Sequence, residues 1–199
     1  MKLLRFINAA AAMLVMAAVS AGCGDSKDEP VPPVEPDQPV LGPEVSQNVI
    51  YQANPRFFAS DECFKAVTAR IPAIADMGCD MLWIMPVNTP GELKAFGSPY
   101  CIRDFRGINP RYGTATDFKA LVDAAHKAGM KVVLDWIANH TAWDHEWITA
   151  HPEYYRKDAA GNIAQASTWT DVAQLDYSNA GTVKAMTDDM LYWVNEMGV

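Results

Sequence analysis

An alternation of apolar strands and amphipathic helices constrains the fold of this chain more than any other feature. From Val49 onward, each apolar run is followed by a loop, a helix with one apolar face, a glycine and the next apolar run. These runs predict strands at residues 49–51, 81–85 and 131–135. Strands that alternate with helices form a parallel sheet with right-handed crossovers. The sequence therefore predicts an α/β fold of three βα units, with Val199 opening a fourth strand.

The three predicted helices are defined by apolar residues that recur at helical spacing. Ser60 and Thr116 are the expected N-caps of the first two helices, and Pro72 is expected to kink the first helix or to start a second short one. Gly78 and Gly129 are expected to end these two helices. The expected buried faces are Phe64, Val67, Ile71 and Ile74 in the first helix, Phe118, Leu121, Val122 and Ala125 in the second, and Val183, Met186, Met190, Trp193 and Met197 in the third.

Two architectures fit this pattern, a doubly wound sheet and a (β/α)8 barrel. No GxGxxG or GK[ST] segment follows a predicted strand, which argues against the nucleotide-binding version of the doubly wound sheet. The predicted loops after the strands, residues 86–115 and about 136–180, are long, whereas the glycine turns before the strands are short. Function is therefore expected at the carboxyl ends of the strands, as in barrels. The continuous apolar run at residues 81–85 predicts a strand that is buried on both faces.

The N-terminus has the layout of a secretory signal. Residues 1–22 contain a basic start, an apolar run too short to span a bilayer and small residues before Cys23. They resemble a bacterial lipoprotein signal in which Cys23 is lipidated, although Ser20 departs from that pattern; the alternative is an ordinary signal peptide. Residues 23–47 are rich in proline and acidic residues and predict an extended tether, and residues 48–199 form the predicted domain. The protein is then expected in the cell envelope, lipid-anchored to the outer membrane and exposed at the cell surface.

The net charge limits the kind of ligand that the chain can bind, and the cysteine content limits its disulfides and metal sites. The 24 acidic residues outnumber the 16 basic ones, so the surface repels nucleic-acid phosphates and suits a neutral ligand such as a sugar. Apart from Cys23, three cysteines remain. Cys63 and Cys79 flank one predicted helix, and at about 1.5 Å per residue their Cα atoms lie farther apart than a disulfide permits. We expect no disulfide, and no cysteine or histidine spacing typical of a metal site is present.

A polar cluster follows the third predicted strand, where Asp135, Asn139 and His140 lie within six residues. The segment VVLDWIANH at residues 132–140, the stretch at residues 97–118 beginning GSPY, the QLDY at residues 174–177 and residues 193–199 together resemble the α-amylase family, glycoside hydrolase family 13. The resemblance implies a partial (β/α)8 TIM barrel, formed by its first three βα units, with a short domain B-like insert after the third strand. It also implies a retaining glycoside hydrolase that acts on α-glucans such as starch and maltodextrins.

The resemblance carries roles to individual residues. Tyr100 matches the tyrosine that stacks on the sugar at the cleavage site, and His140 matches the histidine that hydrogen-bonds the 6-hydroxyl of that sugar. Asp135 matches an aspartate that orients a neighbouring arginine. These residue types suit a pyranose, which offers apolar faces to aromatic rings and hydroxyl edges to polar groups. Trp143, Trp147 and Trp169 are candidates for further sugar contacts, and the alternative for each is packing within the core or the loops. His126, His145 and His151 are expected to be inert or structural.

The same resemblance implies a calcium site and locates the catalytic carboxylates elsewhere. Asn139 and Asp176 match two calcium ligands found in many members, and Ca²⁺ takes six to eight oxygen ligands. No residue matches the nucleophile or the acid/base, which the resemblance implies lie beyond Val199. We therefore expect the chain to be an inactive fragment of a longer enzyme. The alternatives are a genuine short lipoprotein that binds glucans at the cell surface without cleaving them and a non-functional remnant.

Overall fold

The computed structural model describes residues 49–199, and the predicted signal, tether and lipidation site lie outside the described residues. A three-stranded parallel sheet contains β1 (Ile50–Ala53), β2 (Met81–Ile84) and β5 (Lys131–Leu134) in the order β1-β2-β5. Leu82 of β2 is in register with Tyr51 of β1 and Val132 of β5. The α/β fold and the three predicted parallel strands are thereby confirmed.

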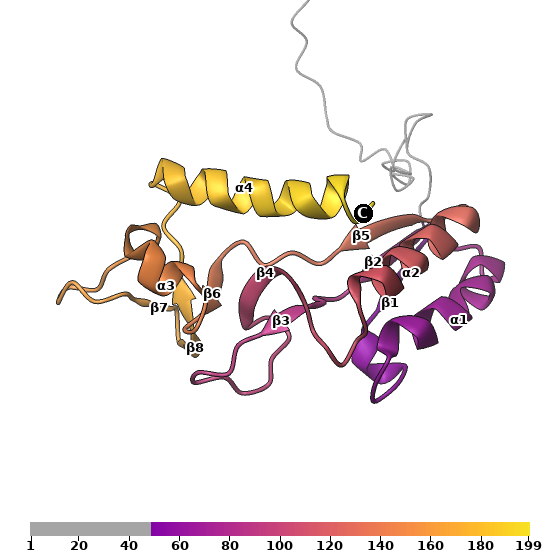
Figure 1. The fold of residues 1–199 in the computed structure, drawn as a ribbon, viewed down its shortest axis with the longest axis horizontal. Coiled ribbons are helices and arrows are strands. Elements are labelled where there is room, and N and C mark those ends of the chain that lie inside the picture. The colour runs from indigo at the N-terminus through magenta and orange to yellow at the C-terminus, as the bar shows by residue number, and fades with distance from the viewer. Residues whose placement is uncertain (1–48) are drawn as a thin grey trace, which may run out of the picture. The chain divides into compact units, whose positions relative to one another are not determined.

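Helices α1 (Cys63–Asp76) and α2 (Ala115–Lys127) pack beside the sheet (Figure 1). Their buried side chains are the ones that helical spacing predicts: Phe64, Val67, Ile71 and Ile74 from α1, and Phe118, Leu121, Val122 and Ala125 from α2. They form one core with Leu82 and Ile84 of β2. Gly78 and Gly129 follow the two helices with φ angles of 79° and 82°, a left-handed conformation that glycine adopts without strain.

The predicted helix starts were wrong. Helix α1 is preceded by Glu62 in a left-handed conformation, not by a Ser60 cap. Helix α2 is capped by Thr114 rather than Thr116, because Asp117 completes a capping box with Thr114. Pro72 lies inside a helix that continues to Asp76, so it does not start a second helix.

One face of β2 is exposed, which corrects the prediction of a strand buried on both sides. Leu82 and Ile84 are fully buried, whereas the side chain of Trp83 between them is 36% exposed and Val133 beside it in β5 is 39% exposed. Helices α1 and α2 cover only the face that carries Leu82 and Ile84. The continuous apolar run therefore indicated the strand correctly but not its surroundings.

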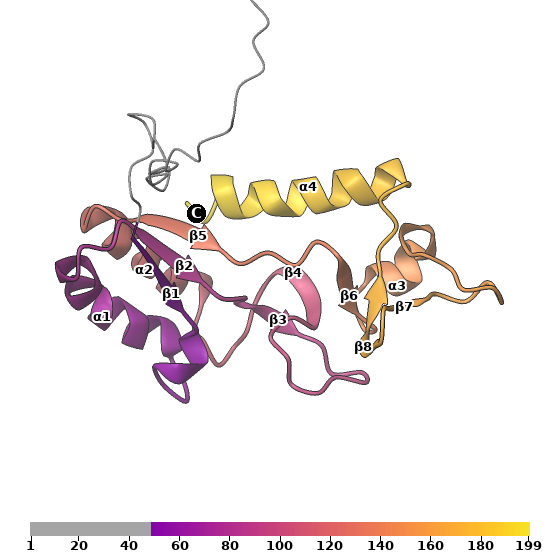
Figure 2. The same ribbon diagram turned by 180° about the vertical axis from the view of Figure 1, so that it is seen from behind.

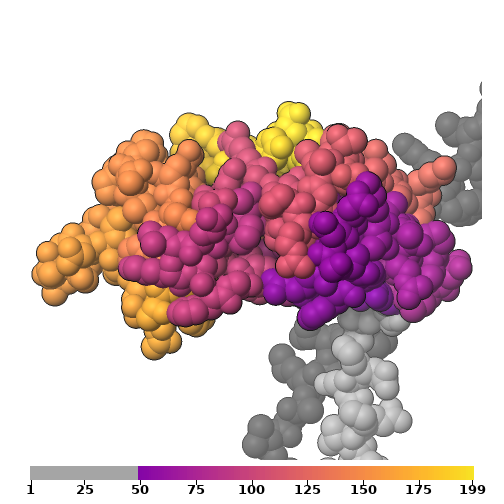
Figure 3. All heavy atoms as spheres, turned by 60° about the horizontal axis from the view of Figure 1, so that its bottom comes forward, coloured from indigo at the N-terminus to yellow at the C-terminus, as the bar shows by residue number. Residues whose placement is uncertain are grey.

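The two long loops contain regular structure that the sequence did not predict. The first holds the antiparallel pair β3 (Asn88–Pro90) and β4 (Ile102–Ile108). The second holds a sheet of β6 (His140–Ala142), β8 (Trp169–Gln174) and β7 (Gln165–Ala166), together with the short helix α3 (Trp147–Ala150) and a 3-10 turn at Pro152–Tyr154. Another 3-10 turn, Pro55–Phe57, lies between β1 and α1. Figure 3 shows the segment after β2, in magenta, between the indigo N-terminal elements and the orange segment after β6.

Helix α4 (Ala180–Asn195) runs from the β6–β8 sheet toward strand β5 of the parallel sheet (Figure 2). Met186, Trp193 and Met197 are buried as predicted, but Val183 and Met190 are nearly half exposed. Thr182 and Asp189 are buried instead. Asp189 and Trp193 face β4, because Asp189 forms an ion pair with Arg106 and the Trp193 indole donates a hydrogen bond to the carbonyl oxygen of Phe105.

The three cysteines of the described region, Cys63, Cys79 and Cys101, are free thiols. Two of them are buried and donate S–H groups to backbone carbonyl oxygens, Cys63 to Ala59 and Cys101 to Asp171. Within residues 49–199, no helix is both long and apolar enough to cross a bilayer.

Candidate functional site

Two of the predicted site residues meet where the segments after β2 and β5 converge. Asp135 directly follows β5, and Tyr100 lies in the turn before β4. The Tyr100 hydroxyl donates a hydrogen bond of 3.0 Å to the Asp135 carboxylate. Burial and this nearby carboxylate raise the pKa of Tyr100, so the phenol stays protonated at neutral pH. Asp135 thus fixes the orientation of an aromatic ring that is partly exposed to solvent.

His140, the first residue of β6, is held against Tyr100 by the backbone. Its Nε2 lies 3.2 Å from the carbonyl oxygen of Tyr100, and its Nδ1 lies 3.1 Å from the side-chain amide of Asn139. Because a carbonyl oxygen only accepts, Nε2 carries the proton and Nδ1 accepts from the amide. Burial lowers the pKa of His140, which favours the neutral ring. Both ring nitrogens are therefore engaged and the tautomer is defined.

Tyr100 and His140 line one cavity of about 280 Å³, here called the Tyr100 pocket, whose walls are Ser98, Tyr100, His140, Trp169, Asp171 and Val172. The two residues that sequence motifs single out thus face the same space. Asp135 is not part of the wall and acts on the pocket through its hydrogen bond to Tyr100.

Strand β8 adds two residues to this pocket. The Trp169 side chain is 54% exposed and packs edge-on against His140, with ring centroids 5.6 Å apart. Asp171, two residues later on the same strand, places its charge near His140. Sequence motifs indicated Trp169 only as one of three candidate tryptophans and assigned no role to Asp171. Their i, i+2 spacing would have put both on one face had β8 been recognised as a strand.

The other candidate tryptophans do not line the Tyr100 pocket. Trp147 is buried among Phe105, His145 and Tyr154. Trp143 donates its indole N–H to the carbonyl oxygen of Thr170.

Asn139 and Asp176, the predicted calcium ligands, are already hydrogen-bonded within the protein. The amide oxygen of Asn139 accepts from Gln174 at 3.0 Å, and one carboxylate oxygen of Asp176 accepts from both the backbone and the hydroxyl of Ser178. Across residues 49–199, no three His, Cys, Asp or Glu side chains gather in a metal-binding arrangement. Two partly engaged side chains supply too few oxygens for Ca²⁺ on their own. The calcium site stays a prediction.

Comparison with known proteins identifies the family. The sequence model of the alpha-amylase catalytic domain matches residues 61–171, more than half of the chain. The chain belongs to the alpha-amylase family. The family resemblance of the sequence motifs is thereby confirmed.

Individual relatives agree with this assignment. An alpha-glucosidase from Culex pipiens is 40% identical over 182 residues, a match that covers 73% of this chain and 31% of the relative. The crystal structure of an alpha-amylase from Lactobacillus plantarum superposes with a TM-score of 0.69 at 44% identity, over 73% of this chain and 36% of that one. A maltogenic alpha-amylase, AmyB from Thermotoga neapolitana, gives a TM-score of 0.72 at 34% identity, over 76% and 37% of the two chains. This member of the alpha-amylase family thus spans about a third of the length of these relatives.

Proposed function

We propose that this chain forms the sugar-binding part of an α-glucan-active glycoside hydrolase of the α-amylase type, which works by a retaining mechanism. The main support is that Tyr100, His140 and Trp169 line one pocket, and that a hydrogen bond to Asp135 orients the tyrosine. Two aromatic rings supply faces for the apolar side of a pyranose, and Ser98 and Asp171 supply hydroxyl partners. The names of the relatives, alpha-glucosidase and alpha-amylase, support a substrate built of α-linked glucose.

In this proposal the three parallel strands β1, β2 and β5 are the first strands of a (β/α)8 barrel, and the β6–β8 sheet is its domain B-like insert. The pocket residues follow β2 and β5 at their carboxyl ends, where barrel enzymes hold their active sites. The described residues bind and orient the sugar. The nucleophile and the acid/base that a retaining glycosidase requires are assigned to no residue of this chain.

Replacing Trp169 with alanine tests this assignment. The chain is expected to bind maltotriose in the Tyr100 pocket, and Trp169→Ala is expected to weaken that binding at least about tenfold, which corresponds to about 1.4 kcal/mol, because an exposed stacking surface is lost. The affinity is measured from the imidazole ¹⁵N signals of His140 during a maltotriose titration. Phe57→Ala, which truncates an aromatic side chain exposed on the 3-10 turn after β1, serves as the control and should leave the affinity unchanged.

Equal affinities of wild type and Trp169→Ala would count against the pocket as a sugar site. Reducing-sugar release is measured on the same samples. Binding without release is expected from a chain that lacks the catalytic pair, whereas release of reducing sugar would show that two of its own carboxylates perform the chemistry.

We further propose that Cys23 carries a lipid that anchors the protein in the cell envelope, at the outer membrane. The support is the signal-like layout of residues 1–22 and the cysteine that follows it. Cys23→Ser, expressed in a Gram-negative host, is expected to abolish incorporation of labelled fatty acid and to shift the protein from the membrane fraction to the soluble fraction. A Cys79→Ser variant, which alters a cysteine inside the described domain, is the control and should remain membrane-bound. Unchanged labelling of Cys23→Ser would overturn the anchor.

A further inference from the structure

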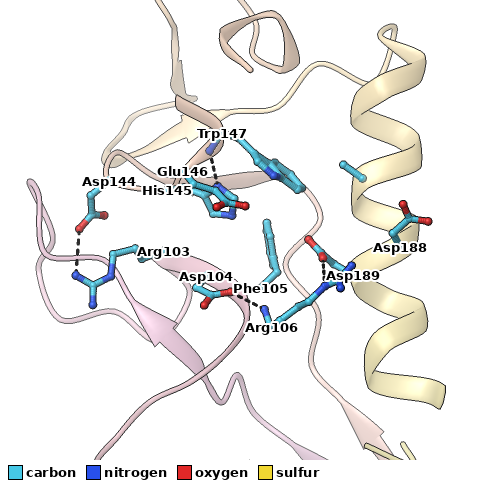
Figure 4. Close-up of a pocket in the computed structure, with 11 residues that line it drawn as sticks. Arg103, Asp104, Phe105, Arg106, Asp144, His145, Glu146, Trp147, Asp188 and Asp189 are labelled. Atoms are coloured by element: carbon cyan, nitrogen blue, oxygen red, sulfur yellow. Dashed lines mark hydrogen bonds and ion pairs between the residues drawn. The ribbon is translucent and has the colours of Figure 1, made fainter. Parts of the chain in front are cut away.

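A second cleft lies away from the Tyr100 pocket and shares no lining residue with it. Its volume is about 530 Å³, nearly twice that of the Tyr100 pocket, and its walls come from β4, from the segment after β6 and from α4 (Figure 4). We call it the α4 cleft and define it by Arg106, His145, Glu146, Ala185 and Asp189, with Phe105 and Trp147 beside them. Its size is within the range of small-molecule binding sites, about 300–1,000 Å³.

His145 presents an unused hydrogen-bond donor in this cleft. The residue is only 4% exposed, and its ring is packed against Phe105 and Trp147. Its Nδ1 accepts the backbone N–H of Trp147 at 3.1 Å, so the neutral ring carries its proton on Nε2. Burial lowers the pKa of His145 to about 4, which keeps the ring neutral at physiological pH. No acceptor for the Nε2 proton exists among the described residues, and Figure 4 shows this nitrogen turned away from Trp147 toward the space between the lining residues.

Donors and acceptors stand side by side on the α4 side of the cleft. Arg106 donates its Nε–H to Asp189 at 2.6 Å, and its two terminal amino groups make no hydrogen bond within residues 49–199. The second carboxylate oxygen of Asp189 is likewise without a hydrogen bond in the described part of the chain. This wall can therefore give and receive hydrogen bonds within a short distance.

Charge and the histidine proton together select the class of ligand. Five carboxylates and two guanidinium groups line the cleft, so an anion is repelled. A cation cannot satisfy the Nε2 proton of His145, because that group requires an acceptor. A hydroxyl group meets all of these demands, since it accepts from His145 and Arg106 and donates to Asp189.

We propose that the α4 cleft binds an uncharged, hydroxyl-rich ligand of mono- or disaccharide size. His145 and Arg106 donate to its hydroxyl oxygens, and Asp189 accepts from its hydroxyl protons. The proposal is independent of the function assigned to the Tyr100 pocket, because the two sites have no residue in common.

The test uses maltose as the probe and the whole chain carrying Trp169→Ala, so that the Tyr100 pocket is impaired. The ¹⁵N signal of His145 Nε2 is expected to shift as maltose is added, while the tautomer stays the same. Adding Ala185→Phe, which places a ring in the cleft and leaves the Arg106–Asp189 pair intact, should weaken this binding at least about tenfold. Ala180→Phe, at an exposed position at the start of the same helix, is the matched control and should bind maltose as the background does.

Two results would overturn the proposal. One is a His145 signal that does not respond to maltose, and this measurement requires no change in the cleft itself. The other is an Ala185→Phe variant that binds maltose as tightly as the Ala180→Phe variant. In the chain with Trp169 intact, a His140 signal that does not respond to maltose while the His145 signal does would contradict the proposed function of the Tyr100 pocket and leave the α4 cleft supported.

Discussion

Replacing Trp193 with alanine is expected to lower the free energy of unfolding by about 3–5 kcal/mol, the usual cost of truncating a large buried aromatic side chain. Trp193 is 1% exposed and is among the largest fully buried side chains of the described region. Its ring packs edge-on against Phe118 of α2 at 5.3 Å, and its indole N–H donates to the carbonyl oxygen of Phe105 in β4 at 2.7 Å. Trp193 therefore attaches α4 both to helix α2 and to strand β4.

Two further variants separate packing from hydrogen bonding. Trp193→Phe keeps most of the apolar contact but removes the indole donor, while the Phe105 carbonyl oxygen still accepts from the Asn88 side-chain amide. The lost hydrogen bond is expected to cost about 0.5–1.5 kcal/mol. Val194→Ala truncates the exposed neighbour and should change the free energy of unfolding by less than about 1 kcal/mol. The measurement is urea-induced unfolding followed by circular dichroism. A Trp193→Ala midpoint close to that of Val194→Ala would show that α4 is held by other contacts.

The sequence predicted best those parts of the fold whose hydrophobic pattern is local. Val67 and Ile71 of α1 and Leu121 and Ala125 of α2 are buried as their helical spacing indicates, because each apolar face repeats within one continuous element. Helix α4 is different. Its orientation depends on Arg106, 83 residues away from Asp189, and a helical pattern carries no information about such a partner.

The short antiparallel strands were missed for the same reason. Strands β6 and β8 pair His140 with Gln174 across a long intervening segment. Strand β6 has only three residues, and the sequence WTDVAQ of β8 does not alternate between apolar and polar residues. Because β8 was missed, two residues of the Tyr100 pocket were missed as well. Motif resemblance located Tyr100, His140 and Asp135, whereas the contribution of Trp169 and Asp171 became evident only once β8 was placed beside β6.

His145 is expected to make the stability of the chain strongly dependent on pH. Its pKa is about 4 in the folded chain, against 6.5 for an ordinary histidine, because burial outweighs the opposing influence of the Asp104 and Asp144 carboxylates. Between these two pH values His145 is protonated in the unfolded chain and neutral in the folded chain. The free energy of unfolding therefore falls as the pH is lowered from 6.5 to 4, by on the order of 3 kcal/mol from this residue, and its contribution is constant above and below that window.

The His145→Asn variant isolates this contribution, since asparagine can still accept the backbone N–H of Trp147 but has no group that titrates. The variant is expected to be less stable at pH 7 because a buried ring is lost. Between pH 6.5 and 4, however, its free energy of unfolding should decline less steeply than that of the wild type. The difference in slope corresponds to the one proton that His145 binds on unfolding in the wild type. Carboxylates whose pKa values are lowered, such as Asp117 and Asp158, contribute equally to both proteins and cancel in the comparison. His126→Asn, at an exposed position on α2, should instead follow the wild-type curve. Urea unfolding at half-unit pH steps measures the slopes. Parallel curves for wild type and His145→Asn would mean that folding does not lower the pKa of His145.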